Sequence, residues 1–200
     1  MLWPSPPWDD PLYWALDLET GGLDVRRDPI LAVGMVPVRA GSVRLGEAYS
    51  TLVRPEGLEV IDPGSIVVHQ LVPRDVREAP VLPEVLREVS RRLEGAVLLV
   101  HQAAIDVAFL RRGFRRCGLR WPEPPVVDTV ALLLKAAKRA RFLDPNAPAI
   151  EPDLNLLAAR RAHGLPEYSQ HDALTDAIAT AELFLVLRRA IGAKTLRDLR

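Results

Sequence analysis

Residues 13–19 are Tyr-Trp-Ala-Leu-Asp-Leu-Glu, an apolar run that ends in two acidic residues. Successive side chains of a strand point to opposite faces, so Asp17 and Glu19, two positions apart, leave the same face of the expected strand. The alternative is an ordinary solvent-facing strand end. The apolar flanks argue against it, because a carboxylate pair among apolar residues needs a counter-charge. The segment therefore predicts a strand that presents two carboxylates to a common cation site.

The rest of the chain predicts an α/β fold. Two further strands are expected over residues 30–38 and 48–53, with turn residues between them, which favours an antiparallel meander. After residue 82 the pattern changes to helices that alternate with short buried strands at 96–100 and 126–127. Helices are expected over residues 83–93, 103–117, 128–140, 154–162 and 172–190. We expect a mixed five-stranded sheet flanked by helices.

Two more acidic clusters lie far along the chain, His101-Gln-Ala-Ala-Ile-Asp106 and His171-Asp-Ala-Leu-Thr-Asp176. Asp106 is expected in a helix that follows a buried strand, where ligands gather beyond the strand ends, although the helix dipole also favours a plain surface aspartate there. Hard divalent cations take carboxylate oxygens from several elements, and two such ions can hold the attacking and leaving oxygens of a phosphate. The three clusters together predict a phosphodiester-cleaving site with two metal ions.

In their order and form the clusters resemble the three motifs of the DnaQ-like 3′–5′ exonucleases, in the DEDDh branch whose third motif is His-x-Ala-x-x-Asp. That family includes the epsilon subunit of bacterial DNA polymerase III, RNase T and oligoribonuclease. The resemblance covers about residues 13–189. It also includes Gly22-Leu-Asp24, Asp28-Pro-Ile30, Val68-His69, Ala79-Pro80 and Asp128-Thr129. It implies a ribonuclease-H-like fold: three antiparallel strands followed by strand–helix units.

The resemblance also implies a role for each cluster residue. Asp17 bridges both metal ions, Glu19 binds the tighter one, Asp176 is a ligand of the first ion, and Asp106 holds the second. His171 is the general base, because a neutral imidazole can take a proton from the attacking water at physiological pH.

Further residues are assigned to the substrate. In the family, backbone groups after the first motif bind the terminal 3′-hydroxyl, which points to Thr20, Gly21 and Gly22, while Leu23 is placed against the last base. A plain turn is the alternative for these four residues. His101 is included as an orienting or structural residue rather than a catalyst. Gln102 and Ile105 replace the usual Asn and Phe of the second motif, so the lining of the site differs from that of relatives.

Composition sets wider bounds. The chain has 200 residues, equal numbers of acidic and basic side chains, and one cysteine, Cys117, which excludes an internal disulfide. The charge balance argues against broad electrostatic adhesion to nucleic acid but does not exclude a nuclease. We expect an extended Pro- and Trp-rich arm over residues 1–11, one exonuclease domain over 12–200, and a loop or flap over 142–153. Without a signal peptide or an apolar membrane span, we expect a cytoplasmic protein.

These features predict a 3′–5′ exonuclease that uses two Mg²⁺ or Mn²⁺ ions and releases nucleoside 5′-monophosphates from single-stranded ends. The substrate is DNA, as in proofreading or repair, or RNA, as for RNase T. A DNA polymerase subunit is a candidate partner, although the end of the sequence at Arg200 favours a stand-alone nuclease. Two other classes stay open: a binding module that keeps the fold without the chemistry, and a phosphodiesterase that acts on mononucleotide esters.

Overall fold

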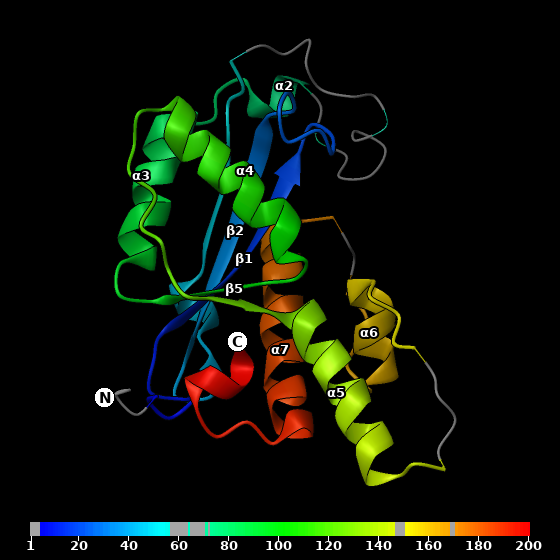
Figure 1. Cartoon of the computed structure of the whole chain (residues 1–200). Helices are drawn as coiled ribbons and strands as arrows, with labels where there is room; N and C mark the ends of the chain where they lie inside the picture. Colours follow the sequence, from blue (N-terminus) through cyan, green and yellow to red (C-terminus); the bar gives the residue numbers. More distant parts are fainter. Residues whose placement is uncertain (1–4, 57–63, 65–70, 72, 147–150, 169–170) are drawn as a thin grey trace.

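The computed structural model has a central sheet with helices on both faces (Figure 1). It describes residues 5–56, 64, 71, 73–146, 151–168 and 171–200, so the Val68-His69 pair of the family resemblance lies outside the described residues. The strands are β1 (Tyr13–Thr20), β2 (Ile30–Arg39), β3 (Ser42–Val43), β4 (Tyr49–Leu52), β5 (Val97–Val100) and β6 (Val126–Asp128). The helices are α2 (Pro73–Val76), α3 (Leu82–Leu93), α4 (Ala103–Arg116), α5 (Thr129–Leu143), α6 (Leu156–Ala162) and α7 (Ala173–Ile191), with 3-10 turns η1 (Leu45–Glu47) and η3 (Leu196–Leu199).

The sheet is mixed, as the sequence predicts. Its order is β3-β2-β1-β5-β6, and β4 also pairs with β2. Strands β1 and β2 are antiparallel, whereas β1, β5 and β6 run parallel to one another. The parallel strands bring their carboxyl ends to one edge of the sheet, where the acidic residues of β1 also lie. The predicted α/β fold of ribonuclease-H type is confirmed.

In the described part of the chain the sheet has six strands rather than the expected five, because two short strands share the outer edge of β2. Strand β3 pairs with Val38 and Arg39, while β4 pairs with residues 32–35, and η1 lies between them. The carbonyl oxygen of Pro37 accepts a hydrogen bond from the Arg44 amide at 2.9 Å on this edge. Proline has no N–H to donate beside that carbonyl, so the ladder is interrupted there.

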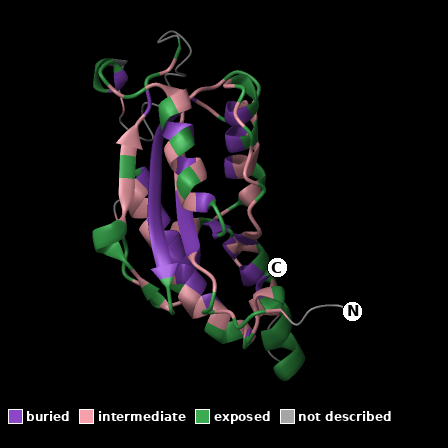
Figure 2. Ribbon diagram, turned by 90° about the vertical axis from the view of Figure 1, so that its left-hand side faces the viewer, coloured by how far each residue is buried: buried purple, intermediate pink, exposed green. Residues whose placement is uncertain are grey.

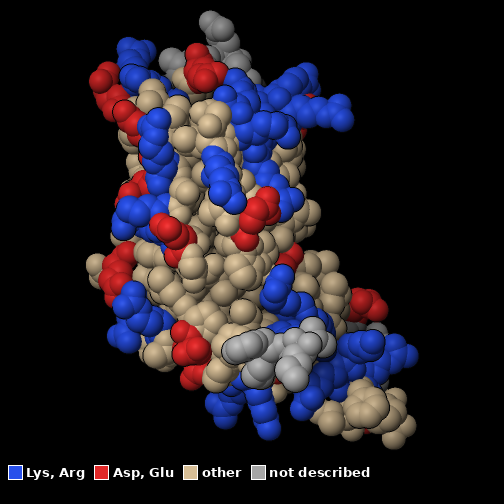
Figure 3. All heavy atoms as spheres, turned by 60° about the vertical axis from the view of Figure 1, so that its left-hand side comes forward, with Lys and Arg blue, Asp and Glu red and all other residues tan. Residues whose placement is uncertain are grey.

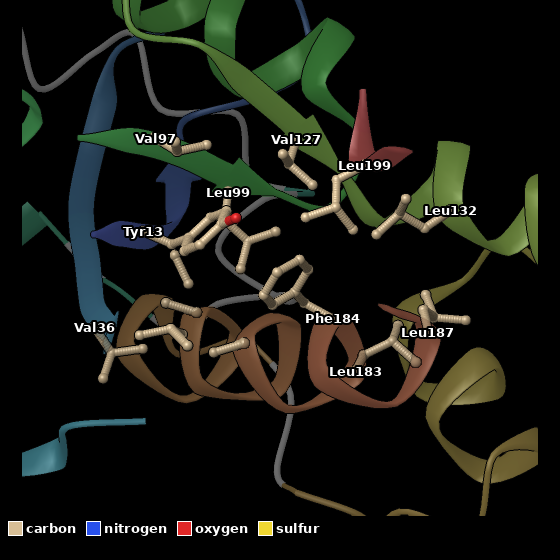
Figure 4. Packing of buried hydrophobic residues seen from close by; sticks show 14 of the residues in the cluster. Tyr13, Val36, Val97, Leu99, Val127, Leu132, Leu183, Phe184, Leu187 and Leu199 are labelled. Atoms are coloured by element: carbon tan, nitrogen blue, oxygen red, sulfur yellow. The ribbon is translucent and has the colours of Figure 1, made fainter. Parts of the chain in front are cut away.

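Two hydrophobic layers enclose the sheet. The side chains of Tyr13 and Ala15 point to the layer formed with α5 and α7, and those of Trp14 and Leu16 point to the layer formed with α3 and α4. Figure 4 shows Tyr13 and Leu99 facing Phe184 of α7, and the Tyr13 and Phe184 ring centroids lie 5.0 Å apart. Figure 2 shows that the strands are largely buried, while the helices expose their outer faces. Continuing the alternation along β1, Asp17 and Glu19 face α7.

The predicted helices are present within a few residues of their expected ends, and α2 was not predicted. Residues 144–146 and 151–153 of the expected flap form neither helix nor strand, whereas residues 142–143 belong to α5 and residues 147–150 lie outside the described residues. In the expected arm, Trp8 packs on Phe184 and its amide donates to the Lys194 carbonyl at 3.0 Å, while Trp3 is not described. Among the helices of the described residues, none is both long enough and apolar enough to span a bilayer.

Candidate active site

A cleft of about 830 Å³ opens where β1 ends and where α4 and α7 begin. Four acidic residues from these three elements line the cleft, together with the histidines of the second and third sequence clusters. The lining includes Asp17, Glu19, Thr20, Gly22, Leu23, His101, Asp106, His171 and Asp176. Nine of the ten residues singled out from the sequence therefore border one cleft, and Gly21 does not. Residues 153–156, which the sequence did not indicate as part of the site, form another wall.

Three carboxylates form the centre of the cleft. One oxygen each of Asp17, Glu19 and Asp176 lies within 4.8 Å of the other two. Two of these groups come from one face of β1, and the third comes from the first turn of α7, more than 150 positions later in the chain. Oxygen ligands that converge in this way fit a hard divalent cation.

Asp106 approaches the cluster from α4 and is almost completely buried, with 5% of its surface exposed. It is not among the three carboxylates that meet within 4.8 Å, although its charge acts on Asp17. The start of α4 is held by Asp128, whose carboxylate accepts from the amides of Gln102 and Ala103 at 3.0 Å each. The same carboxylate accepts from the Val130 amide at 2.9 Å and caps α5. Asp128 therefore positions the helix that carries Asp106.

The electrostatics of the cluster favour a bound cation. Burial, followed by the charges of Asp176 and Asp172, raises the pKa of Glu19 to about 7. Burial raises the pKa of Asp106 to about 8, and burial together with the neighbouring carboxylates raises the pKa of Asp17 well above its ordinary value. A divalent cation among these groups would offset both the lost hydration and the repulsion. The donor set thus fits a metal site on chemical grounds.

His171 lies exposed at the rim of the cleft, directly before α7. Its backbone is left-handed, with φ of 68°, and its amide donates to Asp176 at 3.0 Å. Asp172 caps the helix by accepting from the Thr175 amide at 2.8 Å. This turn holds the Asp176 carboxylate through the backbone and leaves the His171 side chain exposed at the cleft.

The four residues after the β1 carboxylates divide into two groups. The Thr20 hydroxyl donates to the Gly22 carbonyl at 2.7 Å, and Leu23 is 79% exposed at the cleft. Gly21 is buried, and its amide donates to the Pro29 carbonyl at 2.8 Å. Gly21 therefore closes the turn, whereas the other three residues face the cleft.

His101 joins two walls of the cleft. One ring nitrogen lies 2.7 Å from the Thr129 hydroxyl, and the other lies 2.8 Å from the Leu154 carbonyl. Burial lowers the pKa of His101, which favours the neutral ring. A neutral ring that donates to the Leu154 carbonyl accepts from Thr129 when the single proton of that hydroxyl goes to His101 instead of to the Val100 carbonyl, 3.2 Å away. His101 thus ties the segment before α6 to the ends of β5 and β6.

Two positioning residues were missed from the sequence. Gly34 of β2 lies opposite Asp17 in the strand pairing and leaves room for the start of α7. Asp128 was recognised only as the opening of a helix, although it caps two. The Asp-Thr pair at the end of a short strand is a signal for the cap of α5. No local pattern indicates that Asp128 also caps α4, because that helix begins 25 positions before Asp128.

The chain belongs to a family of exonucleases. Residues 14–184 match the RNase_T exonuclease family, which confirms the resemblance to DnaQ-like exonucleases found in the sequence motifs. A DNA polymerase III subunit epsilon-like protein of Rhodobacter capsulatus is 35% identical over 95% of this chain and 25% of its own length. A DNA polymerase III PolC-type of Thermotoga maritima is 31% identical over 88% of this chain and 12% of its own length. The chain thus spans about a quarter or less of these relatives.

Solved structures agree on the fold. The zinc-bound complex of E. coli exonuclease I with single-stranded DNA superimposes with a TM-score of 0.73. The match covers 91% of this chain and 42% of exonuclease I, with 19% sequence identity. At this level of identity the likeness supports the arrangement of strands and helices.

Proposed function

We propose that this chain is a metal-dependent 3′–5′ exonuclease that removes nucleoside 5′-monophosphates one at a time from single-stranded ends. The observation that carries the proposal is the meeting of Asp17, Glu19 and Asp176 within 4.8 Å, in an open cleft that also contains an exposed histidine. Membership of an exonuclease family supports the same reaction class.

The carboxylates are proposed to hold two Mg²⁺ or Mn²⁺ ions. Asp17, Glu19 and Asp176 surround one position, and the buried Asp106 supplies a further oxygen beside Asp17. When bound, the ions would neutralise charge on the scissile phosphate and on the attacking and leaving oxygens. The protein's part is to fix the carboxylates on rigid elements, since they come from a central strand and from the first turns of two helices.

His171 is proposed as the general base. Its exposed ring lies at the cleft rim, and the hydrogen bond from its amide to Asp176 fixes its backbone beside the carboxylate cluster. The ring would take a proton from the water that attacks phosphorus, and the leaving group would be the 3′-oxygen of the upstream nucleotide. A positioned base contributes roughly 10²–10⁴-fold to such a step.

The residues after β1 are proposed to seat the terminal nucleotide. Leu23 exposes its side chain at the cleft and can pack against the last base, while Thr20 and Gly22 border the place of the 3′-hydroxyl. His101 is proposed to position Leu154 and its neighbours as the opposite wall. Gly21, whose amide is used within the turn, is proposed to act only by shaping the turn.

We propose DNA as the substrate. One relative is named DNA polymerase III subunit epsilon-like and another DNA polymerase III PolC-type, and exonuclease I has been solved with single-stranded DNA, which supports DNA as substrate and a DNA polymerase as partner. An RNA-directed activity is the alternative. A DNA-directed and an RNA-directed enzyme differ in which of two strands of matched sequence they cleave faster, so one assay distinguishes them.

The test compares DNA and RNA strands of matched sequence, labelled at the 5′ end, with Mn²⁺ or Mg²⁺. Wild type should produce a ladder that shortens from the 3′ end, and the faster substrate identifies the preferred sugar. His171→Ala and Asp17→Ala should each abolish the ladder. The proposal fails if wild type leaves both strands intact or if the variants cleave as fast as wild type. Cleavage of a chromogenic mononucleotide ester without cleavage of strands would favour the small-ester phosphodiesterase instead.

A further inference from the structure

A second hollow, of about 490 Å³, lies beside the cleft between α4 and the β1–β2 loop. Of the described residues that line it, five are arginines, two are small or apolar, and none is acidic. They are Val25, Arg26, Ala108, Arg111, Arg112, Arg115 and Arg116. The segments that supply them are more than 80 positions apart in the chain, so the cluster exists only in the folded protein. We call it the arginine hollow.

The arginines are only partly neutralised. Arg111 pairs with Glu123 at 3.0 Å and Arg116 with Glu56 at 2.6 Å, and all four side chains are exposed. Exposed pairs of this kind are weak and can exchange for another anion. In the described part of the chain, Arg26 and Arg115 form no ion pair and are exposed, although Asp24 lies near enough to Arg26 for that charge to help lower the Asp24 pKa. The hollow therefore carries a net positive charge, although the formal net charge of the chain is zero.

Arg112 is the least exposed of the five arginines that line the hollow. It is half-buried, and its guanidinium donates to the Asp28 carbonyl at 2.6 Å, which joins α4 to the β1–β2 loop. Burial and the neighbouring charges of Arg116 and Arg115 lower its pKa, whereas the charges of Asp28 and Asp24 raise it. Like charges held this close favour an anion between them. Figure 3 shows basic side chains, with some acidic ones among them, at the upper end of the face in view, the end at which α4 finishes in Figure 1, and a further basic group at the lower end.

The arginine hollow continues the cleft. Ile105, which lines the cleft, lies on the same stripe of α4 as Ala108, Arg112 and Arg115, with spacings of three and four residues. Opposite α4, the β1–β2 loop contributes Leu23 to the cleft, and Val25 and Arg26 to the hollow. At 1.5 Å per residue, Arg115 lies about 13 Å along α4 from Asp106.

We propose that the arginine hollow binds backbone phosphates of a single-stranded nucleic acid, upstream of the nucleotide that is cleaved. The inference rests on the proposed exonuclease function. A strand with its 3′ end at the carboxylates must leave the cleft, and the stripe of α4 leads it to the arginines. Guanidinium groups suit this ligand because they bind phosphate oxygens in pairs and stay charged. Because the contacts go to phosphates, they carry no sequence preference.

The test uses Arg26→Ser/Arg115→Ser, which removes two exposed charges without breaking an ion pair in the described part of the chain. The matched control is Lys138→Ser/Arg141→Ser, which removes two exposed charges from the outer part of α5. Cleavage of a twelve-nucleotide and a three-nucleotide strand is compared for each protein with Mn²⁺. Binding of the fluorescein-labelled longer strand is followed against salt concentration with Ca²⁺ in place of Mn²⁺. Melting temperatures confirm that both variants fold.

Wild type should prefer the longer strand in kcat/KM, and the hollow variant should lose most of that preference, whereas the control should keep it. The slope of log affinity against log salt should become shallower by about 1.4 in the hollow variant, since each phosphate contact on a single strand contributes about 0.7. Equal kcat/KM for the two strands in wild type, or equal slopes in the two variants, would overturn the inference. If wild type cleaves neither strand, the exonuclease proposal fails, and the binding slopes still decide whether the hollow binds phosphates.

Discussion

A Cβ atom on Gly34 would lie 2.1 Å from the carbonyl carbon of Ala173, the first residue of α7. Gly34 is paired with Asp17 across the β1–β2 ladder, so the two residues share one face of the sheet. The absence of a side chain on Gly34 therefore lets the start of α7 reach the sheet next to Asp17. This contact brings Asp176, one turn into α7, to the carboxylates of β1.

The Gly34→Ala substitution is expected to displace the start of α7 and to reduce activity strongly. The added methyl group meets backbone atoms, which cannot move aside as a flexible side chain can, and overpacking of this kind costs about 1–3 kcal/mol. Thermal unfolding and the rate of 3′-end cleavage measure the two effects. The backbone of Gly34 is not left-handed, so the expected loss comes from the collision alone.

Gly46 supplies the control for that experiment. It lies in η1, its backbone is not left-handed, and a Cβ atom there would meet nothing within 4 Å. Gly46→Ala should therefore keep the wild-type melting temperature and cleavage rate. Similar losses in the two variants, or none in Gly34→Ala, would show that the approach of α7 does not depend on Gly34.

The sequence predicts the parts of this site whose patterns are local. The period of two along β1 places Asp17 and Glu19 on one face, and the spacing of the third cluster places His171 before the helix that carries Asp176. Both features are present. The motif order of the family connects the clusters, and the sheet of mixed direction follows from the order of strands and helices.

The parts that were not predicted depend on contacts between distant segments. Gly34 is one glycine among twelve, and only the pairing of β2 with β1 and α7 gives it a role. The arginine hollow combines Arg26 with residues of α4 that follow more than 80 positions later. The unexpected strand β3, residues Ser42–Val43, exists through its pairing with Val38 and Arg39 of β2, and its own two residues give no strand pattern. Single-sequence periodicity cannot detect such relationships.

Removal of the Asp128 carboxylate is expected to destabilise the protein and to slow cleavage. Asp128→Ala leaves the amides of Gln102, Ala103 and Val130 without their acceptor, at the starts of both α4 and α5. A lost helix cap costs about 1 kcal/mol, so two caps predict a loss of about 2 kcal/mol. Denaturant unfolding measures it. Asp144→Ala is the control, because among the described residues this exposed carboxylate accepts only from the Asn146 amide. Equal losses in both variants would contradict the prediction.

Leu23 is expected to affect substrate binding without affecting stability. Its side chain is 79% exposed at the cleft, so Leu23→Ser removes little buried surface from the folded protein. If the side chain packs against the terminal base, KM should rise about tenfold, which corresponds to burial of one apolar side chain. Leu45→Ser is a matched control, since Leu45 is 60% exposed in η1 and does not line the cleft. An unchanged KM for Leu23→Ser would remove the residue from the substrate site.

The carboxylate cluster makes the metal-free protein sensitive to pH. The pKa of Glu19 is raised to about 7 and that of Asp106 to about 8, mainly by burial, whereas both groups titrate lower in the unfolded chain. Between about pH 5 and 8 the folded protein therefore retains protons that the unfolded chain has released. The contribution of these groups to the free energy of unfolding falls as the pH rises through this window. Carboxylates with lowered pKa values, such as Glu88, are ionised in both states there.

Divalent cations should reverse this loss, because they bind the ionised carboxylates and only in the folded state. The rise in melting temperature between EDTA and Mn²⁺ is therefore expected to be small at pH 5 and large at pH 8. Asp17→Asn should melt higher than wild type in EDTA at pH 8, since it removes one of the repelling charges, and should respond little to Mn²⁺. A rise that is equal at the two pH values, or equal in wild type and Asp17→Asn, would mean that the cluster does not hold the metal. Because only melting temperatures are measured, the outcome does not depend on which nucleic acid the protein cleaves.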